Sequence, residues 1–201
     1  MGDVSGRRVL ELGSGAGQWS ASLAAEGGTV VAFDLSDAQL AAAAARMDVA
    51  SFPLIQGAAE QLPFRSGSFD IVFCDHGGLS WGQPALVVPE AARVLRSGGR
   101  LVFNVASPWW EICYDDESDA VTTRLRRDYF GLGVVDEGDG AVSYQLGYGE
   151  WIRTLRNAGL VIVDLIEPRP EPGERSGYLS TLPPDWARRW PAEMLWIAGK
   201  P

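Results

Sequence analysis

Three glycines at alternate positions follow a short apolar run and form the most informative chemical pattern of the chain. The run Val9–Leu12 predicts a buried strand, and Gly13, Gly15 and Gly17 come directly after it, ahead of a segment with helical spacing. Glycine tolerates positive φ and lets a backbone approach a ligand closely. A strand, a glycine turn and a helix in this order typically form a nucleotide pocket at the end of the first strand of an α/β sheet. The alternative is a tight connection that binds no ligand.

A carboxylate stands at the end of the next apolar run. Asp34 follows Thr29–Phe33, about twenty residues past the glycines, where an acidic side chain can accept hydrogen bonds from a ribose diol. Its alternative role is to cap the helix expected over 36–48, but Ser36 and Asp37 are better placed for that. The pattern therefore indicates a dinucleotide or another cofactor that contains adenosine.

Five segments resemble the motifs of class I S-adenosylmethionine-dependent methyltransferases. Glu11–Gly17 lacks the Gly-x-Gly-x-x-Gly spacing of dinucleotide enzymes and is similar to the first methyltransferase motif. Phe33–Ser36 resembles the second motif, Gly57–Phe64 and Ser68–Val72 resemble the third and fourth, and Val94–Phe103 resembles the turn into the fifth strand. The motifs occur in the family's order and cover roughly the first half of the chain.

The resemblance implies roles for the glycine turn. Gly13, Ser14, Gly15 and Gly17 are expected to pass beneath the methionine part of S-adenosylmethionine and to bind its ammonium and carboxylate. The N-terminus of the following helix favours that carboxylate by about 0.3–1 kcal/mol. Glu11 is expected to support the turn from below, with a solvent-facing strand residue as its alternative.

The resemblance also implies an adenosine-binding half. Asp34 is expected to hold the ribose, Leu35 to pack on the adenine, and Ala59 and Glu60 to lie at the adenine edge. The family often has an aspartate where this chain has Ala58, which removes one adenine hydrogen bond. The departure puts more weight on Glu60, whose alternative role is that of a surface residue.

Asp75 and His76, at the end of the strand expected over 69–74, are expected to face the methyl group. Methyl transfer is an in-line substitution that needs no metal. Orientation can supply about 7–11 kcal/mol, and a general base about 10²–10⁴-fold. His76 is the only histidine and has a suitable ordinary pKa, which Asp75 could raise while orienting the ring. Alternatively, His76 packs on the cofactor without moving a proton. Trp81 or Trp109 could stabilise the sulfonium.

Three functions are compatible with these motifs. The favoured one is a methyltransferase that acts on an oxygen, nitrogen or carbon nucleophile of a small molecule. A catalytically silent domain that binds S-adenosylmethionine or a partner is the alternative, and the glycine spacing disfavours a nicotinamide-dependent oxidoreductase. The segment Cys74–Gly77 replaces the Asn/Asp-Pro-Pro-Tyr motif of many amino-nitrogen methyltransferases, which argues against DNA bases and protein glutamine as acceptors.

Composition narrows the setting. The 201 residues have a formal net charge of −9, which argues against binding to a nucleic acid backbone. No apolar run reaches the ~20 residues of a membrane span, and no leader precedes the first strand, so a cytoplasmic protein without membrane contact is expected. The resemblance implies a monomer or homodimer, because many members of the family are one or the other. Cys74 and Cys113 do not suggest a disulfide framework, and the cluster Arg124, Arg126 and Arg127 is interpreted as a solvated helix face.

Alternating strand and helix signals predict a Rossmann-like α/β fold. It has a mainly parallel seven-stranded sheet, helices on both faces and an antiparallel last strand. The glycines of 98–99 and of 157–159 are expected to end helices. Strands are expected near 8–13, 29–34, 53–56, 69–74, 100–106, 160–167 and 193–199, and helices near 17–27, 36–48, 84–96 and 148–158.

We expect one methyltransferase domain over 1–201, interrupted by an insertion over 107–147. Only about seven residues precede the first strand, where related methyltransferases usually carry helices that cover the cofactor. The insertion follows the fifth strand and is therefore expected to serve as a lid or substrate region. Its many aromatic residues favour a small satellite core over a binding wall. Residues 168–191 are rich in proline and glycine and predict a long surface loop.

Overall fold

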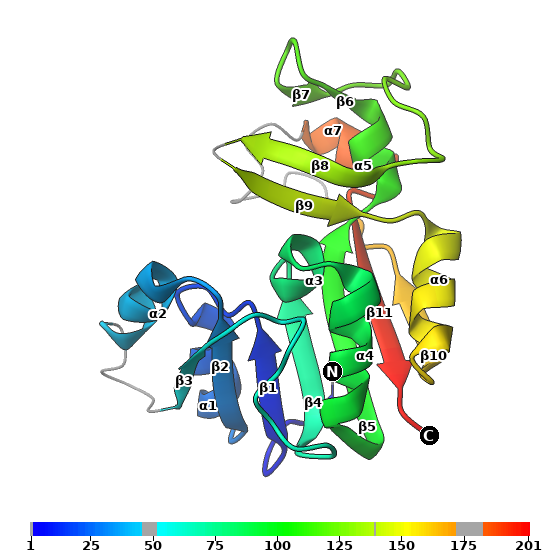
Figure 1. Cartoon of the computed structure of the whole chain (residues 1–201). Coiled ribbons are helices and arrows are strands. Elements are labelled where there is room, and N and C mark those ends of the chain that lie inside the picture. Colours follow the sequence, from blue (N-terminus) through cyan, green and yellow to red (C-terminus); the bar gives the residue numbers. More distant parts are fainter. Residues whose placement is uncertain (1, 46–51, 139, 172–182) are drawn as a thin grey trace.

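A seven-stranded sheet forms the centre of the molecule (Figure 1). The computed structural model describes residues 2–45, 52–138, 140–171 and 183–201. The strand order is β10-β11-β5-β4-β1-β2-β3, and β11 runs antiparallel to both of its neighbours. This arrangement confirms the predicted sheet and its antiparallel last strand. The strands are β1 (Arg8–Leu12), β2 (Thr29–Asp34), β3 (Leu54–Gln56), β4 (Phe69–Asp75), β5 (Leu95–Ala106), β10 (Val161–Ile166) and β11 (Glu193–Gly199).

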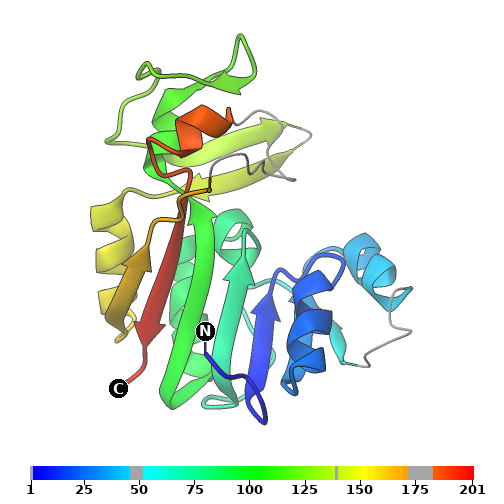
Figure 2. The same cartoon turned by 180° about the vertical axis from the view of Figure 1, so that it is seen from behind.

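Helices cover both faces of the sheet, as predicted (Figures 1 and 2). Helices α4 (Pro84–Val94) and α6 (Tyr148–Asn157) pack on one face, and α1 (Gln18–Ala25) packs on the other. Helix α2 (Asp37–Ala44) is shorter than expected, and residues 46–48 of its predicted range lie outside the described residues. A one-turn helix that the sequence did not predict, α3 (Gly78–Trp81), lies between β4 and α4.

Strand β4 explains why the core has two sides. Val72 and Cys74 pack toward α4 and α6, while Ile71 and Phe73 pack toward α1, and all four are buried. A parallel strand with helices on both faces needs apolar residues at successive positions. Packing on both faces therefore holds the carboxyl end of β4 in the middle of the sheet, where it can position the side chains of a functional site.

The Gly98-Gly99 pair does not end a helix, which corrects the prediction. Helix α4 ends at Val94, and the next residue, Leu95, is already extended and fully buried in β5. The Gly98 N–H donates to the Lys200 carbonyl at 2.8 Å, and the Lys200 N–H donates to the Gly99 carbonyl at 2.9 Å. The glycines thus form an irregular part of β5 that pairs with the residue after β11. The second predicted glycine stop is confirmed, because Gly159 has a φ of 77° directly after α6.

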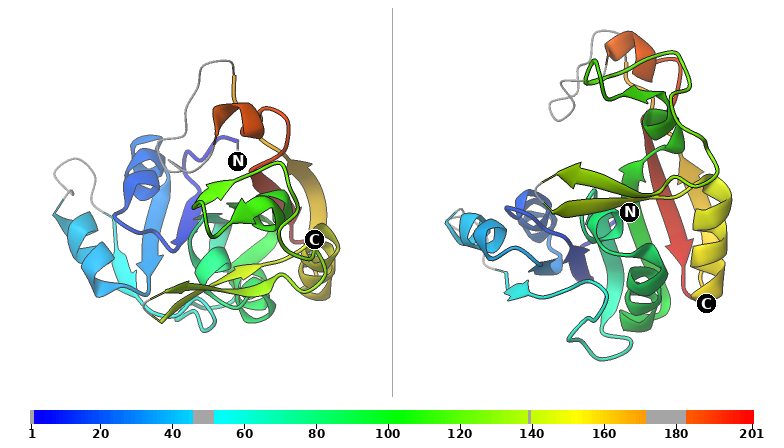
Figure 3. Two further views of the ribbon diagram at one scale, coloured as in Figure 1. Left: turned by 90° about the horizontal axis from the view of Figure 1, so that it is seen from above. Right: turned by 45° about the horizontal axis from the view of Figure 1, so that its top comes forward.

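The insertion forms a small layer above the carboxyl end of the sheet (Figures 1 and 3). It contains α5 (Pro108–Cys113) and two hairpins, β6 (Tyr114–Asp115) with β7 (Ala120–Val121) and β8 (Gly133–Gly138) with β9 (Ala141–Gln145). Strand β9 lies against α3. None of these elements was predicted as such, because short hairpins carry little periodicity.

The aromatic residues of the insertion build the satellite core that the sequence favoured. Trp110, Tyr114 and Tyr129 pack around Ile112 and Val121. Part of the predicted surface loop joins them: Trp186 of α7 (Pro184–Ala187) is buried in this cluster, while residues 172–182 lie outside the described residues.

The arginine cluster is not a helix face, which corrects a second expectation. The segment that holds Arg126 and Arg127 is irregular. Arg126 pairs with Asp115 at 2.7 Å, and Arg127 pairs with Glu111 and Asp116. These arginines therefore bind the acidic residues of their own insertion.

Candidate active site

A cavity of about 1150 Å³ opens at the carboxyl ends of β1, β2 and β4. This volume lies at the upper end of the range for small-molecule sites. Its walls contain all but one of the residues that the sequence analysis assigned to the site: Glu11, Gly13, Ser14, Gly15, Asp34, Leu35, Ala59, Glu60, Asp75 and His76. The exception is Gly17, which has a left-handed backbone at the start of α1, where an added Cβ would lie 3.2 Å from the Ala43 Cβ.

Direct backbone contact between two glycine segments forms the floor of the cavity. Gly13 has a φ of 73°, and a Cβ built on it would lie 2.4 Å from the Gly78 nitrogen. A Cβ on Gly77 would lie 2.4 Å from the Leu12 carbonyl oxygen. Neither position can hold a side chain unless the turns move apart. By contrast, Gly15 has a φ of 52°, and a Cβ built on it would make only an ordinary contact with Gln39 Oε1 at 3.8 Å.

Asp34 holds the glycine turn and faces the cavity. Its two carboxylate oxygens accept hydrogen bonds from the Gly15 N–H and the Ser36 N–H, both at 2.8 Å. The cap of α2 is Ser36, whose Oγ accepts the Gln39 N–H at 3.3 Å. The capping role considered for Asp34 is therefore filled by Ser36.

Glu11 lies beneath the turn and is only 2% exposed, so its alternative as a solvent-facing residue is wrong. The Ser20 hydroxyl donates a short hydrogen bond to it and links β1 to the first turns of α1. Burial raises the pKa of Glu11 to about 7, against the opposing hydrogen bond from Ser20 and with a smaller contribution from the charges of Asp75 and Asp34. A carboxyl group that holds its proton near neutrality thus lies under the site.

This raised pKa predicts a specific pH dependence of stability. The folded state retains the Glu11 proton between the usual pKa near 4.5 and a pH of about 7, whereas the unfolded state releases it. Stability is therefore lost as the pH rises through this window. We expect the unfolding free energy of the wild type to fall by about 3 kcal/mol, relative to Glu11→Gln, between about pH 5 and about pH 8. Urea denaturation of both proteins measures this difference, and parallel pH profiles would contradict the assignment.

The predicted adenine wall contains one unusually exposed apolar side chain. Leu35 is 70% exposed and lines the cavity, as do Ala59 and Glu60. Glu60 Oε1 accepts the Gln83 N–H at 3.1 Å, so one oxygen ties the loop to the start of α4.

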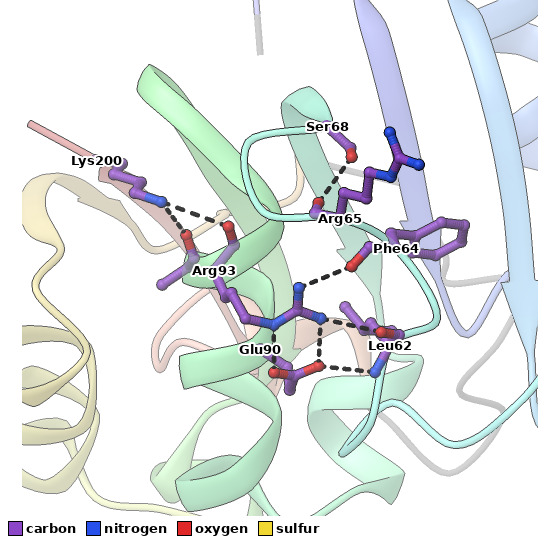
Figure 4. A network of polar contacts seen from close by, with 8 residues as sticks. Leu62, Phe64, Arg65, Ser68, Glu90, Arg93 and Lys200 are labelled. Atoms are coloured by element: carbon purple, nitrogen blue, oxygen red, sulfur yellow. Dashed lines mark hydrogen bonds and ion pairs between the residues drawn. The ribbon is translucent and has the colours of Figure 1, made fainter.

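A polar network on α4 holds the loop that carries this wall (Figure 4). The Arg93 guanidinium donates to the carbonyl oxygens of Leu62 and Phe64 at 2.9 and 2.7 Å, and it pairs with Glu90. Glu90 in turn accepts the Leu62 N–H at 2.8 Å. Because these bonds satisfy the loop backbone, the segment after β3 has a defined position beside the cavity.

Asp75 is bonded to two side chains that the sequence analysis did not assign to the site. One oxygen accepts the Trp19 Nε1–H at 2.7 Å, and the other accepts the Asn104 Nδ2–H at 3.1 Å. Trp19, on α1, is 48% exposed, lines the cavity and packs edge-on against Phe73.

His76 has a left-handed backbone, with a φ of 48°. Such a conformation costs about 1–3 kcal/mol and is typical of functional sites. Two hydrogen bonds maintain it: the His76 N–H donates to the Asn104 carbonyl at 3.0 Å, and the His76 carbonyl accepts the Trp81 Nε1–H at 3.0 Å. Trp81 also lines the cavity, whereas the other candidate for the sulfonium, Trp109, does not.

The carboxylate partner of the His76 ring is Glu193, at the start of β11, and not Asp75. The His76 Nε2 and Glu193 Oε1 atoms lie 3.1 Å apart. Burial disfavours the charged imidazolium, but the hydrogen bond and charge of Glu193 outweigh it and raise the pKa of His76 above its usual value, with Asp75 as the smallest contributor. The bond from His76 likewise lowers the pKa of Glu193.

Asn104 and Glu193 were missed, although each carries a signal. Asn104 is a lone polar residue in the apolar strand Leu101–Ala106. Glu193 opens an antiparallel strand and pairs with Ala106, so its side chain reaches the edge where the parallel strands end. An acidic residue at the start of an antiparallel strand is therefore a site candidate in such a sheet.

Two buried polar atoms in the cavity wall have no hydrogen-bond partner among the described residues. They are Ser14 Oγ and Asn104 Oδ1. An unsatisfied buried polar group costs about 1–3 kcal/mol, and a bound ligand with matching groups removes that cost. These two polar atoms and the exposed side chain of Leu35 fit a ligand that combines hydrogen-bonding groups with one flat ring that packs on an apolar side chain.

The class of protein follows from this geometry and from two similarities. Residues 10–103 match the family model described as a methyltransferase domain. The fold resembles that of an S-adenosylmethionine-dependent methyltransferase from Mesorhizobium loti, with a TM-score of 0.80 and 20% identity over 100% of this chain and 94% of that chain. The chain thus contains a region similar to a methyltransferase domain, which spans just under half of its length, and it has the fold of S-adenosylmethionine-dependent methyltransferases.

Other relatives share the domain but have different names. The chain is 35% identical to a demethylmenaquinone methyltransferase of Lactococcus lactis over 108 residues, which are 51% of this chain and 43% of that protein. It thus spans less than half the length of this relative. A 1,6-didemethyltoxoflavin N1-methyltransferase of Burkholderia thailandensis, crystallised with its acceptor and S-adenosylhomocysteine, has a TM-score of 0.65 and 19% identity over 98% of this chain and 72% of that chain.

Within the described residues, no helix is both long and apolar enough to cross a membrane.

Proposed function

We propose that this protein transfers a methyl group from S-adenosylmethionine to an oxygen, nitrogen or carbon nucleophile of a small molecule. The observation that carries the proposal is the cavity above the glycine turn. Asp34 and the unpartnered Ser14 hydroxyl lie in its wall, and the contact of Gly13 with Gly78 makes its floor. The match to the methyltransferase-domain model and the shared fold support S-adenosylmethionine as the methyl donor.

The cofactor fits the groups present in the wall. The backbone of the turn and Ser14 Oγ would bind the methionine end, Asp34 the ribose, and Leu35 with Ala59 and Glu60 the adenine. Asp34 already accepts two backbone N–H groups, and a carboxylate oxygen has lone pairs left for a ribose hydroxyl. Gly17 would contribute through the start of α1 and not through direct contact.

The bound cofactor supplies an electrophilic methyl group on a sulfonium. The chain supplies orientation, which contributes about 7–11 kcal/mol when reacting atoms are held in line. Trp19 and Trp81 line the cavity near Asp75, and their indole rings can stabilise a neighbouring cation by about 0.5–2 kcal/mol. Asp75 and His76 face the same space from the end of β4.

A small acceptor is supported by the acidity of the chain. The net charge of −9 disfavours a nucleic acid. The named relatives act on a quinone and on a toxoflavin precursor, so the shared domain by itself does not select the acceptor.

The proposed enzyme is a single domain over 1–201. The insertion over 107–147 would act as its lid or substrate region. None of the described insertion residues lines the cavity, but β9 lies against α3, which carries Trp81. The proposed setting is the cytoplasm, with the protein as a monomer or homodimer.

Isothermal titration calorimetry tests the cofactor assignment. We expect S-adenosylhomocysteine to bind with a dissociation constant on the order of micromolar, about −8 kcal/mol, and NAD to give no heat at the same concentration. The carboxylate and glycine spacing fit an adenosyl amino acid and not a pyrophosphate. Binding of NAD alone, or of neither compound to folded protein, would contradict the proposal. Binding without turnover on a broad panel of acceptors would favour the silent-domain alternative.

A further inference from the structure

We propose that His76, Glu193 and Asn104 form the end of the cavity that activates the methyl acceptor. This end would bind a neutral or cationic group with a transferable proton, namely a hydroxyl or an amine, and would reject a carboxylate. His76 would be the base and Glu193 its positioning residue. The inference rests on the proposed function, because the reaction it serves is the methyl transfer. It adds to that function the chemical class of the acceptor and the source of the base.

The first support is the geometry of three strand ends. His76 follows β4, Asn104 lies near the end of β5, and Glu193 begins the antiparallel β11, so all three meet at one edge of the sheet. His76 Nε2 lies 3.1 Å from Glu193 Oε1, and Asn104 Nδ2 lies 3.3 Å from Glu193 Oε2. All three line the cavity.

The second support is the proton arrangement that these contacts dictate. The amide of Asn104 has two hydrogens, and the carboxylates of Asp75 and Glu193 accept them. Its 3.2 Å approach to His76 Nε2 then cannot be a donation, so the Nε2 proton goes to Glu193. In a neutral ring this leaves Nδ1 as the nitrogen that accepts a proton.

The third support is the unpartnered Asn104 Oδ1, which is buried in the cavity wall. As an oxygen acceptor it can bind an O–H or N–H group but not a deprotonated carboxylate. A ligand that donates a hydrogen bond here would satisfy the atom.

The charges of the lining point to the same class. Among the described residues, no lysine or arginine lines the cavity. Its acidic groups are Glu11, which holds its proton near neutrality, and the four carboxylates Asp34, Glu60, Asp75 and Glu193. An anionic acceptor would have to enter this space without a fixed cation to pair with, which is unfavourable in a partly desolvated site. An acceptor with a neutral hydroxyl or a protonated amine matches the negative electrostatic potential of the cavity.

The proposed step keeps its atoms and charges in balance. The acceptor's O–H or N–H bond breaks, the proton moves to His76 Nδ1, and the released electron pair forms the bond to the methyl carbon as the carbon–sulfur bond breaks. The imidazolium then retains its Nε2–H bond to Glu193, whose negative charge stabilises it.

This arrangement gives the base a defined pH range. The charged groups that face His76 are Glu193 from β11 and Asp75 from β4, and both favour the imidazolium. The base is active only when neutral, so the rate should rise with pH through a pKa above 6.5. Removal of the Glu193 charge should move that rise to lower pH.

NMR titration of the histidine ring tests the pairing without an acceptor. His76 is the only histidine in the sequence, so its ring signals need no assignment by mutation. We expect a pKa above 6.5 in the wild type and a fall of at least about half a unit in Glu193→Gln, because an adjacent opposite charge shifts a pKa by about 1–3 units. Glu26→Gln, at the exposed end of α1, is the matched control and should leave the value unchanged. An equal pKa in all three folded proteins would overturn the pairing.

Three probes with one skeleton test the acceptor class: benzylamine, benzyl alcohol and benzoate. Each is added to protein saturated with S-adenosylhomocysteine, and the ring signals of His76 are followed. We expect benzylamine or benzyl alcohol to shift these signals at least about tenfold more strongly, at equal concentration, than benzoate. A stronger response to benzoate, or no response to any probe, would overturn the assignment. Failure of S-adenosylhomocysteine to bind the wild type would instead refute the proposed function.

Discussion

Replacing Gly13 with alanine is expected to abolish measurable binding of S-adenosylhomocysteine and to destabilise the fold. The new Cβ would lie 2.4 Å from the Gly78 nitrogen, and a φ of 73° is already strained for alanine. A left-handed residue costs about 1–2 kcal/mol, and overpacking adds about 1–3 kcal/mol. Because backbone meets backbone, the turn must move to relieve the contact, and the cavity floor moves with it. Calorimetry and thermal denaturation measure the two effects.

The control variant Gly6→Ala separates the effect of backbone strain at positive φ from the effect of steric overlap of the new Cβ. Gly6 has a φ of 68°, similar to that of Gly13, but a Cβ there would meet no atom within 4 Å. We expect this control to lose about 1–2 kcal/mol of stability and to bind S-adenosylhomocysteine like the wild type. If Gly13→Ala also bound within about threefold of the wild type, roughly 0.7 kcal/mol, the glycine contact would not be the floor of the cofactor site.

The second large effect is expected for Asp34→Ala. The carboxylate accepts N–H groups from Gly15 and Ser36, and the proposed ribose contact adds hydroxyl donors. Hydrogen bonds to a charged group are worth about 1.5–3 kcal/mol each, so S-adenosylhomocysteine should bind at least about 100-fold more weakly. Calorimetry on the variant measures the loss, and circular dichroism shows whether the fold is retained.

Asp37→Ala is the matched control for this experiment. Asp37 lies three residues further on, and its side chain is exposed and accepts only the neighbouring Ala38 N–H. Asp34 ends β2 and Asp37 begins α2, so removal of Asp37 deletes the same charge from the other end of one short connection. A general electrostatic effect would therefore weaken binding in both variants alike. Unchanged binding in Asp34→Ala would contradict the ribose assignment, whatever the control does.

These two sites and the acceptor end belong to different parts of the sheet. The glycine turn and Asp34 belong to β1 and β2, which are neighbours and parallel. The acceptor end needs β11, which arrives antiparallel beside β5 and brings Glu193 to the same edge. Binding of the cofactor and activation of the acceptor can therefore be changed separately by mutation.

The sequence by itself determined the strands of the sheet and the glycine turn above which the cofactor site is proposed. The extents of β1, β2, β4 and β11 agree with prediction to within about a residue, because each lies in a continuous apolar run bounded by turn residues. The glycine turn was predictable for a related reason. Its strand, its turn and its helix are contiguous, and local backbone geometry decides their arrangement.

The tertiary structure alone decided which side chains meet across the sheet. His76 bonds with Glu193, 117 residues away, and not with its neighbour Asp75, because β11 runs antiparallel beside β5 and brings Glu193 to the edge of the sheet where β4 ends. Trp19 lies on α1, and its indole Nε1–H donates a hydrogen bond to Asp75 at the end of β4. Trp186 joins the insertion core from a distant segment. The periodicity of apolar residues in the sequence predicts which face of a helix or strand is buried. Which residues that face or the strand end contacts depends on how the strands and helices pack against one another.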